Sequence, residues 1–380
     1  MEKITGKTIY VFGAGASQHS GAPLLRDFLV TARLLLESNP NLKHKNSFIK
    51  VFDWIDKLRG SSYYIEFDLD NLEHIFSLCE MLKQVGDTEG KELSSNLNYL
   101  VMETLDRKCQ LEWRKDQFLP NPQYKEFIDC LRFINDQRRT TLGKPEGEFE
   151  RDLIITFNYD VMLDYAMWFV NLMPEYCLFP PPYRNNGYRL LKLHGSINWA
   201  MCRECVKKNL KSTIQVVRPN PMPPNAMTPP YVSDGTLFEL RMMTEVLPNT
   251  PCVSCNAQNM LEPFIIPPTW SKAVGNTPLA PVWEAAVKEI KTAFQIIVVG
   301  YSMPATDTFF QYLLTLGLAQ NSRLNRVVIV DKDPSPSLQE RYAKVFARSL
   351  NDRGRLQFIT GITFAQFVSE RMRPIGSQVG

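Results

Sequence analysis

The segment TIYVFGAGASQHSGAP, residues 8–23, decides the fold class. The apolar run at residues 9–12 is typical of a buried strand, and it ends abruptly in Gly13-Ala14-Gly15-Ala16-Ser17. Glycines at such a strand end let backbone N–H groups approach a pyrophosphate, and the start of a following helix favours negative charge. The segment therefore predicts a nucleotide-binding loop, with a plain tight turn as the alternative.

This loop does not predict a dehydrogenase. It reads Gly13-x-Gly15-x-x-Gln18, so glutamine stands where the dinucleotide fingerprint has its third glycine. No second strand follows closely enough to supply the acidic residue that binds a ribose in dehydrogenases. A hydride-transfer enzyme is therefore disfavoured.

Later apolar runs extend the pattern into a sheet. Runs with the length and composition of buried parallel strands lie at residues 153–157, 190–193, 296–299, 327–330 and 356–360. Helical stretches separate them, and small or polar residues follow them. The sequence predicts an α/β fold with a doubly wound, mostly parallel, Rossmann-like sheet.

Two long intervals interrupt this sheet. Residues 31–148 are expected to form a helical insertion, in which Asp70 and Glu73 predict a capping box before a helix. Residues 201–256 are rich in proline and carry two Cys-x-x-Cys pairs, which predicts a small zinc module. The Rossmann-like core is expected from residues 1–30, 149–200 and 257–380.

The composition and charge of the chain disfavour several classes of function. The 380 residues carry a formal net charge of +3 with scattered basic residues, so direct nucleic-acid binding is not indicated. No apolar run approaches the roughly 20 residues that span a bilayer, and the N-terminus lacks the layout of a signal peptide. A cytoplasmic location without a membrane partner is expected, in which the eight cysteines are thiols or metal ligands rather than disulfides.

Polar residues follow two of the expected core strands. Thr156-Phe157-Asn158-Tyr159-Asp160 ends one strand, and His194-Gly195 ends the next. Ligands of α/β proteins bind at this edge of the sheet, where a histidine can act as a base or contact a ribose. The alternatives are that Asn158 and Asp160 cap the next helix and that His194 is structural.

Four cysteines form the most specific local pattern. Cys202 and Cys205 make one Cys-x-x-Cys pair, and Cys252 and Cys255 make the other. Together they can supply four thiolates to a tetrahedral, structural zinc ion, because a closed four-thiolate site leaves no open position for catalysis. Chance spacing and two strained disulfides are the alternatives.

Two later strand ends complete the edge. Gly300-Tyr301-Ser302 follows one strand and Asp331 follows another. Gly300 and Ser302 can hold a nucleoside through backbone and hydroxyl groups, and Asp331 can bind paired ribose hydroxyls. Ordinary polar turns are the alternative.

Taken together and in order, these motifs resemble those of the sirtuin family. The family pattern has a GAGxS loop, Ser-Gly-x-Pro, T-x-N-x-D, HG, two Cys-x-x-Cys pairs, G-[TY]-S and a polar residue at a last strand end. The matching segments here are residues 13–17, 20–23, 156–160, 194–195, the four cysteines, residues 300–302 and Asp331. The resemblance covers the sheet and the zinc module but not the helical insertion.

The resemblance implies that NAD is bound and that its nicotinamide–ribose bond is broken. Asn158 would contact the nicotinamide ribose and order the attacking water, and His194 would act on the ribose hydroxyls as general base. The NAD-binding set that the resemblance implies is Gly13, Ala14, Gly15, Ala16, Ser17, Pro23, Asp27, Asn158, Asp160, Gly300, Ser302 and Asp331. NAD+ would be a substrate, and Zn2+ the structural cofactor.

The chain departs from protein-deacylating sirtuins where those enzymes bind peptide. Phe157 replaces a glutamine, residues 24–28 replace the Asp-Phe-Arg after the proline, and EPFIIPPTWSK (residues 262–272) replaces the peptide-pairing strand. With its helical insertion, the pattern looks like the sirtuin-like NAD-hydrolysing proteins of bacterial anti-phage defence. Those proteins work as homo-oligomers beside a partner such as a HerA-type ATPase or an Argonaute, and they kill the infected cell by consuming NAD.

The expected function is therefore NAD+ hydrolysis, with two alternatives. An NAD-dependent protein deacylase would need an acyl-lysine substrate, whereas a hydrolase releases ADP-ribose from NAD alone. A non-catalytic sensor of an NAD derivative is the other alternative, and the presence of both Asn158 and His194 argues against it.

Overall fold

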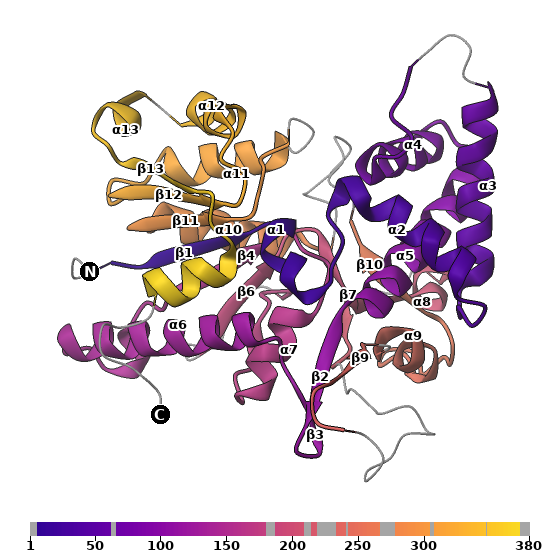
Figure 1. Cartoon of the computed structure of the whole chain (residues 1–380), viewed down its shortest axis with the longest axis horizontal. Coiled ribbons are helices and arrows are strands. Elements are labelled where there is room, and N and C mark those ends of the chain that lie inside the picture. The colour runs from indigo at the N-terminus through magenta and orange to yellow at the C-terminus, as the bar shows by residue number, and fades with distance from the viewer. Residues whose placement is uncertain are drawn as a thin grey trace.

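A seven-stranded sheet with the order β13-β12-β11-β1-β4-β6-β5 lies at the centre of the protein (Figure 1). The computed structural model describes residues 6–61, 66–179, 187–208, 214–218, 233–240, 242–266, 278–304, 308–346 and 348–372. The strands of the sheet are β1 (Thr8–Phe12), β4 (Leu153–Thr156), β5 (Pro174–Glu175), β6 (Tyr188–Lys192), β11 (Gln295–Val299), β12 (Arg326–Asp331) and β13 (Leu356–Thr360). Every neighbouring pair in it is parallel.

The strand order is that of a doubly wound sheet. From β1 the chain moves to β4 and β6 on one side, and it then returns to place β11 beside β1, followed by β12 and β13. The loops after β1 and β11 therefore lead to opposite faces, and doubly wound sheets bind their ligands beside such a switch point, at the carboxyl edge of the strands. The predicted α/β, Rossmann-like fold is confirmed, and so are the strands expected from the apolar runs.

Helices cover both faces of this sheet (Figure 1). On one face α6 (Pro122–Thr141) packs against α7 (Met162–Phe169), and on the other α10 (Ala280–Lys291) packs against α11 (Thr308–Leu318). The rings of Tyr124 and Phe127 on α6 contact Phe12 of β1. The remaining helices of the core are α12 (Pro336–Val345), α13 (Arg348–Asp352), α14 (Phe364–Phe367) and a π-helical turn, Val368–Met372. Although α6 falls within residues 31–148, it is the crossover helix between β1 and β4.

The other helices of residues 31–148 pack together beside the sheet. They are α3 (Lys45–Ser61), α4 (Leu72–Gln84) and α5 (Thr88–Lys108), joined by α2 (Leu25–Ser38). The capping box predicted from Asp70 and Glu73 is wrong. Asn71 is the N-cap of α4, because its side-chain oxygen accepts a hydrogen bond from the Glu73 N–H, while Asp70 pairs with Arg59 at 2.6 Å.

Two small sheets lie outside the central sheet, and the first of them connects the insertion to the cysteine-bearing segment. The first joins β2 (Gln110–Arg114), β3 (Gln117–Leu119) and β9 (Thr236–Glu239), and the second joins β7 (Gly195–Cys202), β8 (Gln215–Val216) and β10 (Leu261–Ile265). The short helices α8 (Arg203–Lys207) and α9 (Met242–Val246) lie between these strands. Since β9 pairs with β2, segments more than a hundred residues apart form one sheet. Of the helices that the structure describes, none is long and apolar enough to cross a membrane.

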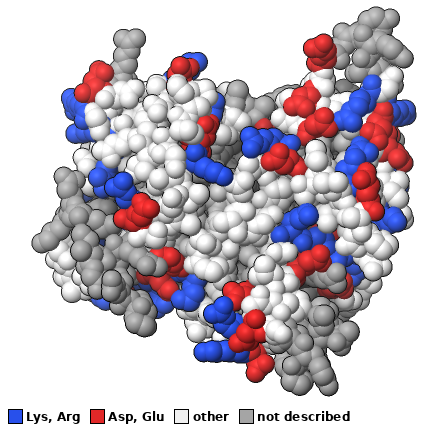
Figure 2. Space-filling model, viewed as in Figure 1, with Lys and Arg blue, Asp and Glu red and all other residues white. Residues whose placement is uncertain are grey.

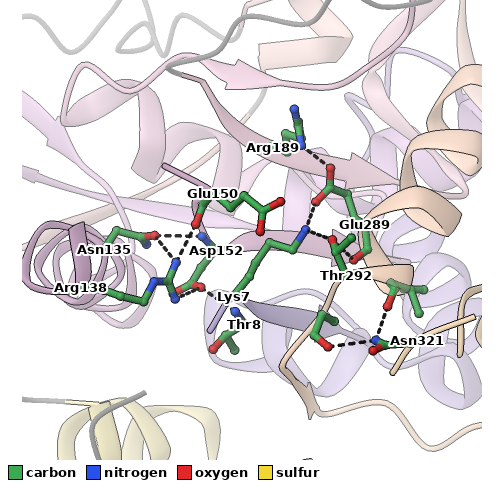
Figure 3. A network of polar contacts seen from close by, with 12 residues as sticks. Lys7, Thr8, Asn135, Arg138, Glu150, Asp152, Arg189, Glu289, Thr292 and Asn321 are labelled. Carbon is green, nitrogen blue, oxygen red and sulfur yellow. Dashed lines mark hydrogen bonds and ion pairs between the residues drawn. The ribbon is translucent and has the colours of Figure 1, made fainter. Parts of the chain in front are cut away.

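A largely buried ionic network lies at the amino edge of the sheet, opposite the edge that carries the glycine loop (Figure 3). Lys7 donates to Glu289 at 2.6 Å, and Glu289 also pairs with Arg189. Arg138 on α6 pairs with Asp152 at 2.6 Å, and Asp152 accepts the Thr8 N–H. Helix carboxyl ends meet this edge, where cations are favoured by the helix dipole. The basic groups of the network are therefore already paired, and their role is to join helices to strands.

The loops after β1 and β11 touch through glycines. The Gly13 N–H donates to Val299 O at 3.0 Å, and the Gly15 N–H donates to Gly300 O at 2.9 Å. A Cβ on Gly13 would lie 2.6 Å from Gly300 O, and one on Gly300 would lie 2.5 Å from Ala16 N. Gly300 also has a φ of +60°, which side chains rarely adopt. Only glycine fits this contact, so it fixes the two loops against each other.

We predict that Gly300→Ala lowers the free energy of unfolding by about 2–4 kcal/mol, because left-handed strain and a backbone clash add together. Gly354→Ala is the matched control. Gly354 has a φ of +62°, and a Cβ on it would meet nothing within 4 Å, so strain alone should cost about 1 kcal/mol there. Urea unfolding of both variants measures the difference, and equal losses would contradict the proposed contact.

Candidate functional site

The sequence-predicted residues meet at the carboxyl edge of the sheet. Thr156 of β4 pairs with Phe12 of β1 and with Lys192 of β6, so the residues that follow these strands emerge side by side. Asn158 follows β4, His194 follows β6, and the glycine loop follows β1. Because β1 and β11 flank the switch point, this cluster occupies the position at which doubly wound sheets bind ligands.

The Asn158 side chain is held by the glycine loop. Its Nδ2 donates to Gly13 O at 2.9 Å and to the Ser17 hydroxyl at 2.8 Å, and its own N–H donates to Thr156 Oγ1 at 3.1 Å. Both amide hydrogens are thereby used within the protein. Among the described residues, none donates a hydrogen bond to the Asn158 side-chain oxygen. The half-buried carboxamide therefore offers its oxygen as an acceptor for a water or a hydroxyl group.

Ser17 connects Asn158 to a residue that sequence reasoning missed. Its hydroxyl lies 2.7 Å from the hydroxyl of Tyr124, which is 1% exposed on α6. Burial raises the pKa of Tyr124 well above its ordinary value, so its hydroxyl stays protonated. No local pattern around Tyr124 marks it as a site residue, because only the packing of α6 on β1 brings it to the loop.

Asp160 is fully enclosed rather than open to a ligand. Burial raises its pKa, and the charge of Lys192 and a hydrogen bond from Ser17 act in the opposite direction. Its Oδ1 accepts the Met162 N–H at 3.0 Å, at the start of α7. Asp160 thus bonds the first N–H of α7, although the N-cap position of this helix is Val161 and not Asn158 or Asp160. Contact of Asp160 with NAD stays a prediction.

Lys192 supports the loop that carries Asn158 and Asp160. Its buried ammonium donates to Asp160 O at 2.7 Å and to Asp164 Oδ2 at 3.0 Å. Asp164 also accepts the Tyr176 hydroxyl at 2.5 Å. A charge this deep is tolerated only when it is paired and hydrogen-bonded, so the Lys192–Asp164 pair pins the loop to α7.

His194 is 3% exposed and lies among aromatic rings. Its ring centroid is 5.0 Å from that of Phe157, which in turn stacks on Tyr301 at 4.5 Å. Its carbonyl accepts the Ile266 N–H at 2.8 Å, and Gly195, with a φ of +80°, follows it. Phe157, which replaces a glutamine of the deacylase pattern, thus forms an apolar wall beside the histidine. An apolar surrounding strengthens the electrostatic effect of any polar group in it.

The remaining residues of the predicted NAD-binding set follow β1, β11 and β12 and differ in how far they are buried. Ala14 and Ala16 lie in α1 (Ala14–Ser17), and the N–H groups of Gly13, Gly15 and Ala16 are bonded within the chain. Pro23 is half-buried just before α2, and Asp27 is exposed in its first turn. Ser302 is exposed beside Gly300, and Asp331 is half-buried with its pKa raised by burial. Their contacts with NAD stay predictions.

The four cysteines of the two Cys-x-x-Cys pairs converge. Their Sγ atoms all lie within 4.8 Å of one another, with Cys202 3.6 Å from Cys255 and Cys205 3.6 Å from Cys252. Zinc–sulfur bonds of about 2.3 Å in a tetrahedron place the sulfurs about 3.8 Å apart, whereas a disulfide requires about 2.0 Å. All eight cysteines are free, as expected from the sequence. The cluster therefore fits a tetrahedral metal and excludes the two disulfides.

Charges of both signs are mixed on one face of the molecule. In Figure 2, Lys and Arg are interspersed with Asp and Glu on this face, and its centre is mostly uncharged. Of the EPFIIPPTWSK segment, residues 262–266 lie in or next to β10, while residues 267–272 fall outside the described residues.

Comparison with known proteins gives structural neighbours only. No family model and no curated protein matches the chain. A crystal structure of Sir2 with an inhibitor, 2'-O-acetyl-ADP-ribose and a deacetylated peptide is 14% identical, with a TM-score of 0.37, over 96% of this chain and 91% of that one. A substituted Sir2 homologue with 2'-O-acetyl-ADP-ribose is 15% identical, with a TM-score of 0.42, over 97% and 90%. Another, with ADP-ribose, is 16% identical, with a TM-score of 0.40, over 98% and 95%. Similarity this low gives no information on the chemistry of the site, which has to be inferred from the residues of this chain.

We predict that the protein purifies with about one zinc ion per chain and that Cys205→Ser loses most of it, because three thiolates no longer close the tetrahedron. Cys177→Ser is the control, since Cys177 is buried but lies outside the cluster. Metal analysis of protein purified without chelator measures both. Well under one zinc in the wild-type chain, or equal zinc in the two variants, would refute the assignment.

Proposed function

We propose that this protein is an NAD+ glycohydrolase, which cleaves the bond between nicotinamide and ribose and releases ADP-ribose. NAD would bind across the switch point, with its pyrophosphate at the glycine loop and its nicotinamide ribose beside Asn158 and His194. The order and type of the sirtuin-like motifs support the choice of NAD. The topology supports the position of the site.

The observation that carries this proposal is the orientation of Asn158. Its amide hydrogens are bonded to Gly13 O and Ser17 Oγ, so only the oxygen is left to act on a ligand. An oxygen acceptor at the carboxyl edge suits a group that binds a ribose hydroxyl or orients a water molecule. A hydrolase needs both, because the water must lie against the anomeric carbon when nicotinamide departs.

Cleavage of the nicotinamide–ribose bond requires little acid catalysis from the protein. Nicotinamide is cationic in NAD+, so it leaves as a neutral molecule and the ribose becomes oxocarbenium-like. The remaining tasks are to position the water and to remove its proton. We assign positioning to Asn158 and proton removal, through the ribose hydroxyls, to His194. The apolar wall of Phe157 would limit competing water.

Protein deacylation is the second candidate, and two observations weigh against it. Phe157 fills the space beside His194 with an aromatic ring, where the deacylase pattern has a polar glutamine. The deacylase motif after the proline is also absent, since residues 24–28 read Leu-Leu-Arg-Asp-Phe. A deacylase would cleave NAD only when an acyl-lysine peptide is present, which makes the two activities separable in one assay.

We further propose a setting for this activity. The chain would be a sirtuin-like defence protein of the bacterial cytoplasm, with a structural zinc ion and NAD as its substrate. It would act as a homo-oligomer, beside a HerA-type ATPase or another partner, and deplete NAD during phage infection. The helices α2–α5, which pack beside the sheet rather than over its strands, are the segment that we expect to contribute to assembly.

We predict that Asn158→Ala reduces NAD cleavage by about a hundred- to a thousandfold while NAD binding and the fold are retained. The loss arises because one preorganised polar group at the reacting centre is removed. Asn96→Ala, at a half-buried position on α5 away from the sheet edge, is the control and should keep full activity. Release of nicotinamide, followed by chromatography, measures the rate. Activity of Asn158→Ala within a few-fold of the wild type would overturn the site assignment.

His194→Ala should have a similar effect, for a related reason. If the two residues act as one unit on the same ribose and water, the double variant is little slower than either single one. If the losses of activation free energy in the two single variants instead add in the double variant, His194 and Asn158 act independently, which would contradict a shared role on one ribose and water.

A further inference from the structure

We propose that Tyr124, on α6, is a positioning residue that orients the Asn158 carboxamide through the Ser17 hydroxyl. The effect of Tyr124 on catalysis rests on the proposed NAD cleavage, whereas its effect on the orientation of Asn158 does not. The network spans three separate segments of the chain: the loop after β1, the end of β4, and the crossover helix α6.

The carboxamide of Asn158 has two possible orientations, and its neighbours select one. Its Nδ2 lies 2.9 Å from Gly13 O and 2.8 Å from Ser17 Oγ. A flipped side chain would place its oxygen against the Gly13 carbonyl, which is an acceptor only. Gly13 O alone can hold one amide hydrogen, and the second depends on whether the Ser17 oxygen is available as an acceptor.

Tyr124 determines the state of that oxygen. A serine hydroxyl has one hydrogen and two lone pairs. One lone pair accepts from Asn158 Nδ2, and the Tyr124 hydroxyl shares a second hydrogen bond with the Ser17 hydroxyl at 2.7 Å. With either hydroxyl as the donor, this second bond restricts rotation of Ser17, so that a lone pair stays directed at Asn158.

The Tyr124 ring is itself immobilised. It is 1% exposed, and its centroid lies 5.0 Å from that of His19, 5.5 Å from that of Phe364 and 6.4 Å from that of Phe12. Phe364 belongs to α14, so the carboxyl-terminal part of the described chain also packs behind the site. Since these contacts are made by the ring, phenylalanine would keep them and remove only the hydroxyl.

Loss of the hydroxyl frees Ser17 to rotate and leaves Asn158 held firmly at one amide hydrogen only. The side-chain oxygen then spends less time toward the substrate. In Tyr124→Phe, kcat for NAD cleavage should fall by about tenfold, with KM changed by less than about twofold, because the rest of the binding surface is intact. Tyr165→Phe is the matched control, since its hydroxyl donates to Phe118 O at 3.0 Å, outside the network.

A double-variant comparison shows whether Tyr124 acts through Ser17. If it does, Tyr124→Phe combined with Ser17→Ala has the kcat of Ser17→Ala alone, because the route through the Ser17 hydroxyl is already broken. Losses of kcat that multiply would show that Tyr124 does not act through Ser17, and a fall in kcat for Tyr165→Phe as large as that for Tyr124→Phe would show a general effect of losing a buried hydroxyl. Either result would overturn the proposal.

A second readout does not depend on activity. Protein labelled with ¹⁵N at asparagine gives a pair of side-chain amide proton signals for Asn158, which are assigned by their loss in Asn158→Ala. Tyr124→Phe should shift one of the two and raise its exchange rate with water by about tenfold, and Tyr165→Phe should leave both unchanged. Unchanged amide signals in Tyr124→Phe would overturn the positioning role of Tyr124, whatever the kcat of that variant. An inactive wild-type protein would overturn the proposed function, and the amide signals would still decide the role of Tyr124.

Discussion

The contact between two glycine loops at the switch point of the sheet is the constraint on which the site depends. Gly13 and Gly15 donate to the carbonyls of Val299 and Gly300, at distances that leave no room for a side chain. The contact fixes the loop after β1 against the loop after β11. It also fixes the Gly13 carbonyl, which then holds Asn158 from the adjacent strand end. Backbone geometry at one point thus sets the orientation of the side chain that we assign to the chemistry.

The charges around the site are arranged to hold the loop rather than to bind a ligand directly. The ammonium of Lys192 is used on Asp160 O and Asp164, and the Asp160 carboxyl accepts the first N–H of α7. The two residues to which we assign the chemistry are an asparagine whose amide hydrogens are bonded within the protein and a histidine beside aromatic rings. That combination suits a reaction whose leaving group is already cationic, because no strong acid is needed and water must be positioned rather than excluded completely.

The sheet and its functional edge could be predicted from the sequence because both follow from local patterns. Strands buried on both faces are continuous apolar runs, and parallel strands carry their functional residues at one end. The cysteine cluster could be predicted because metal ligands require a fixed spacing. Tyr124 could not be predicted, since it is one aromatic residue in a long helix and only tertiary packing brings its hydroxyl to Ser17. The cap of α4 could not be predicted from the local pattern, because Asp70 and Asn71 are both good caps and Asp70 is bonded by Arg59 of another helix.

Mass spectrometry of the products formed from NAD+ in ¹⁸O-labelled water, with no peptide present, tests the central claim most directly. The account predicts equimolar nicotinamide and ADP-ribose, with one labelled oxygen atom on the ribose carbon that carried nicotinamide. Intact NAD+, or nicotinamide release only after an acyl-lysine peptide is added, would contradict it.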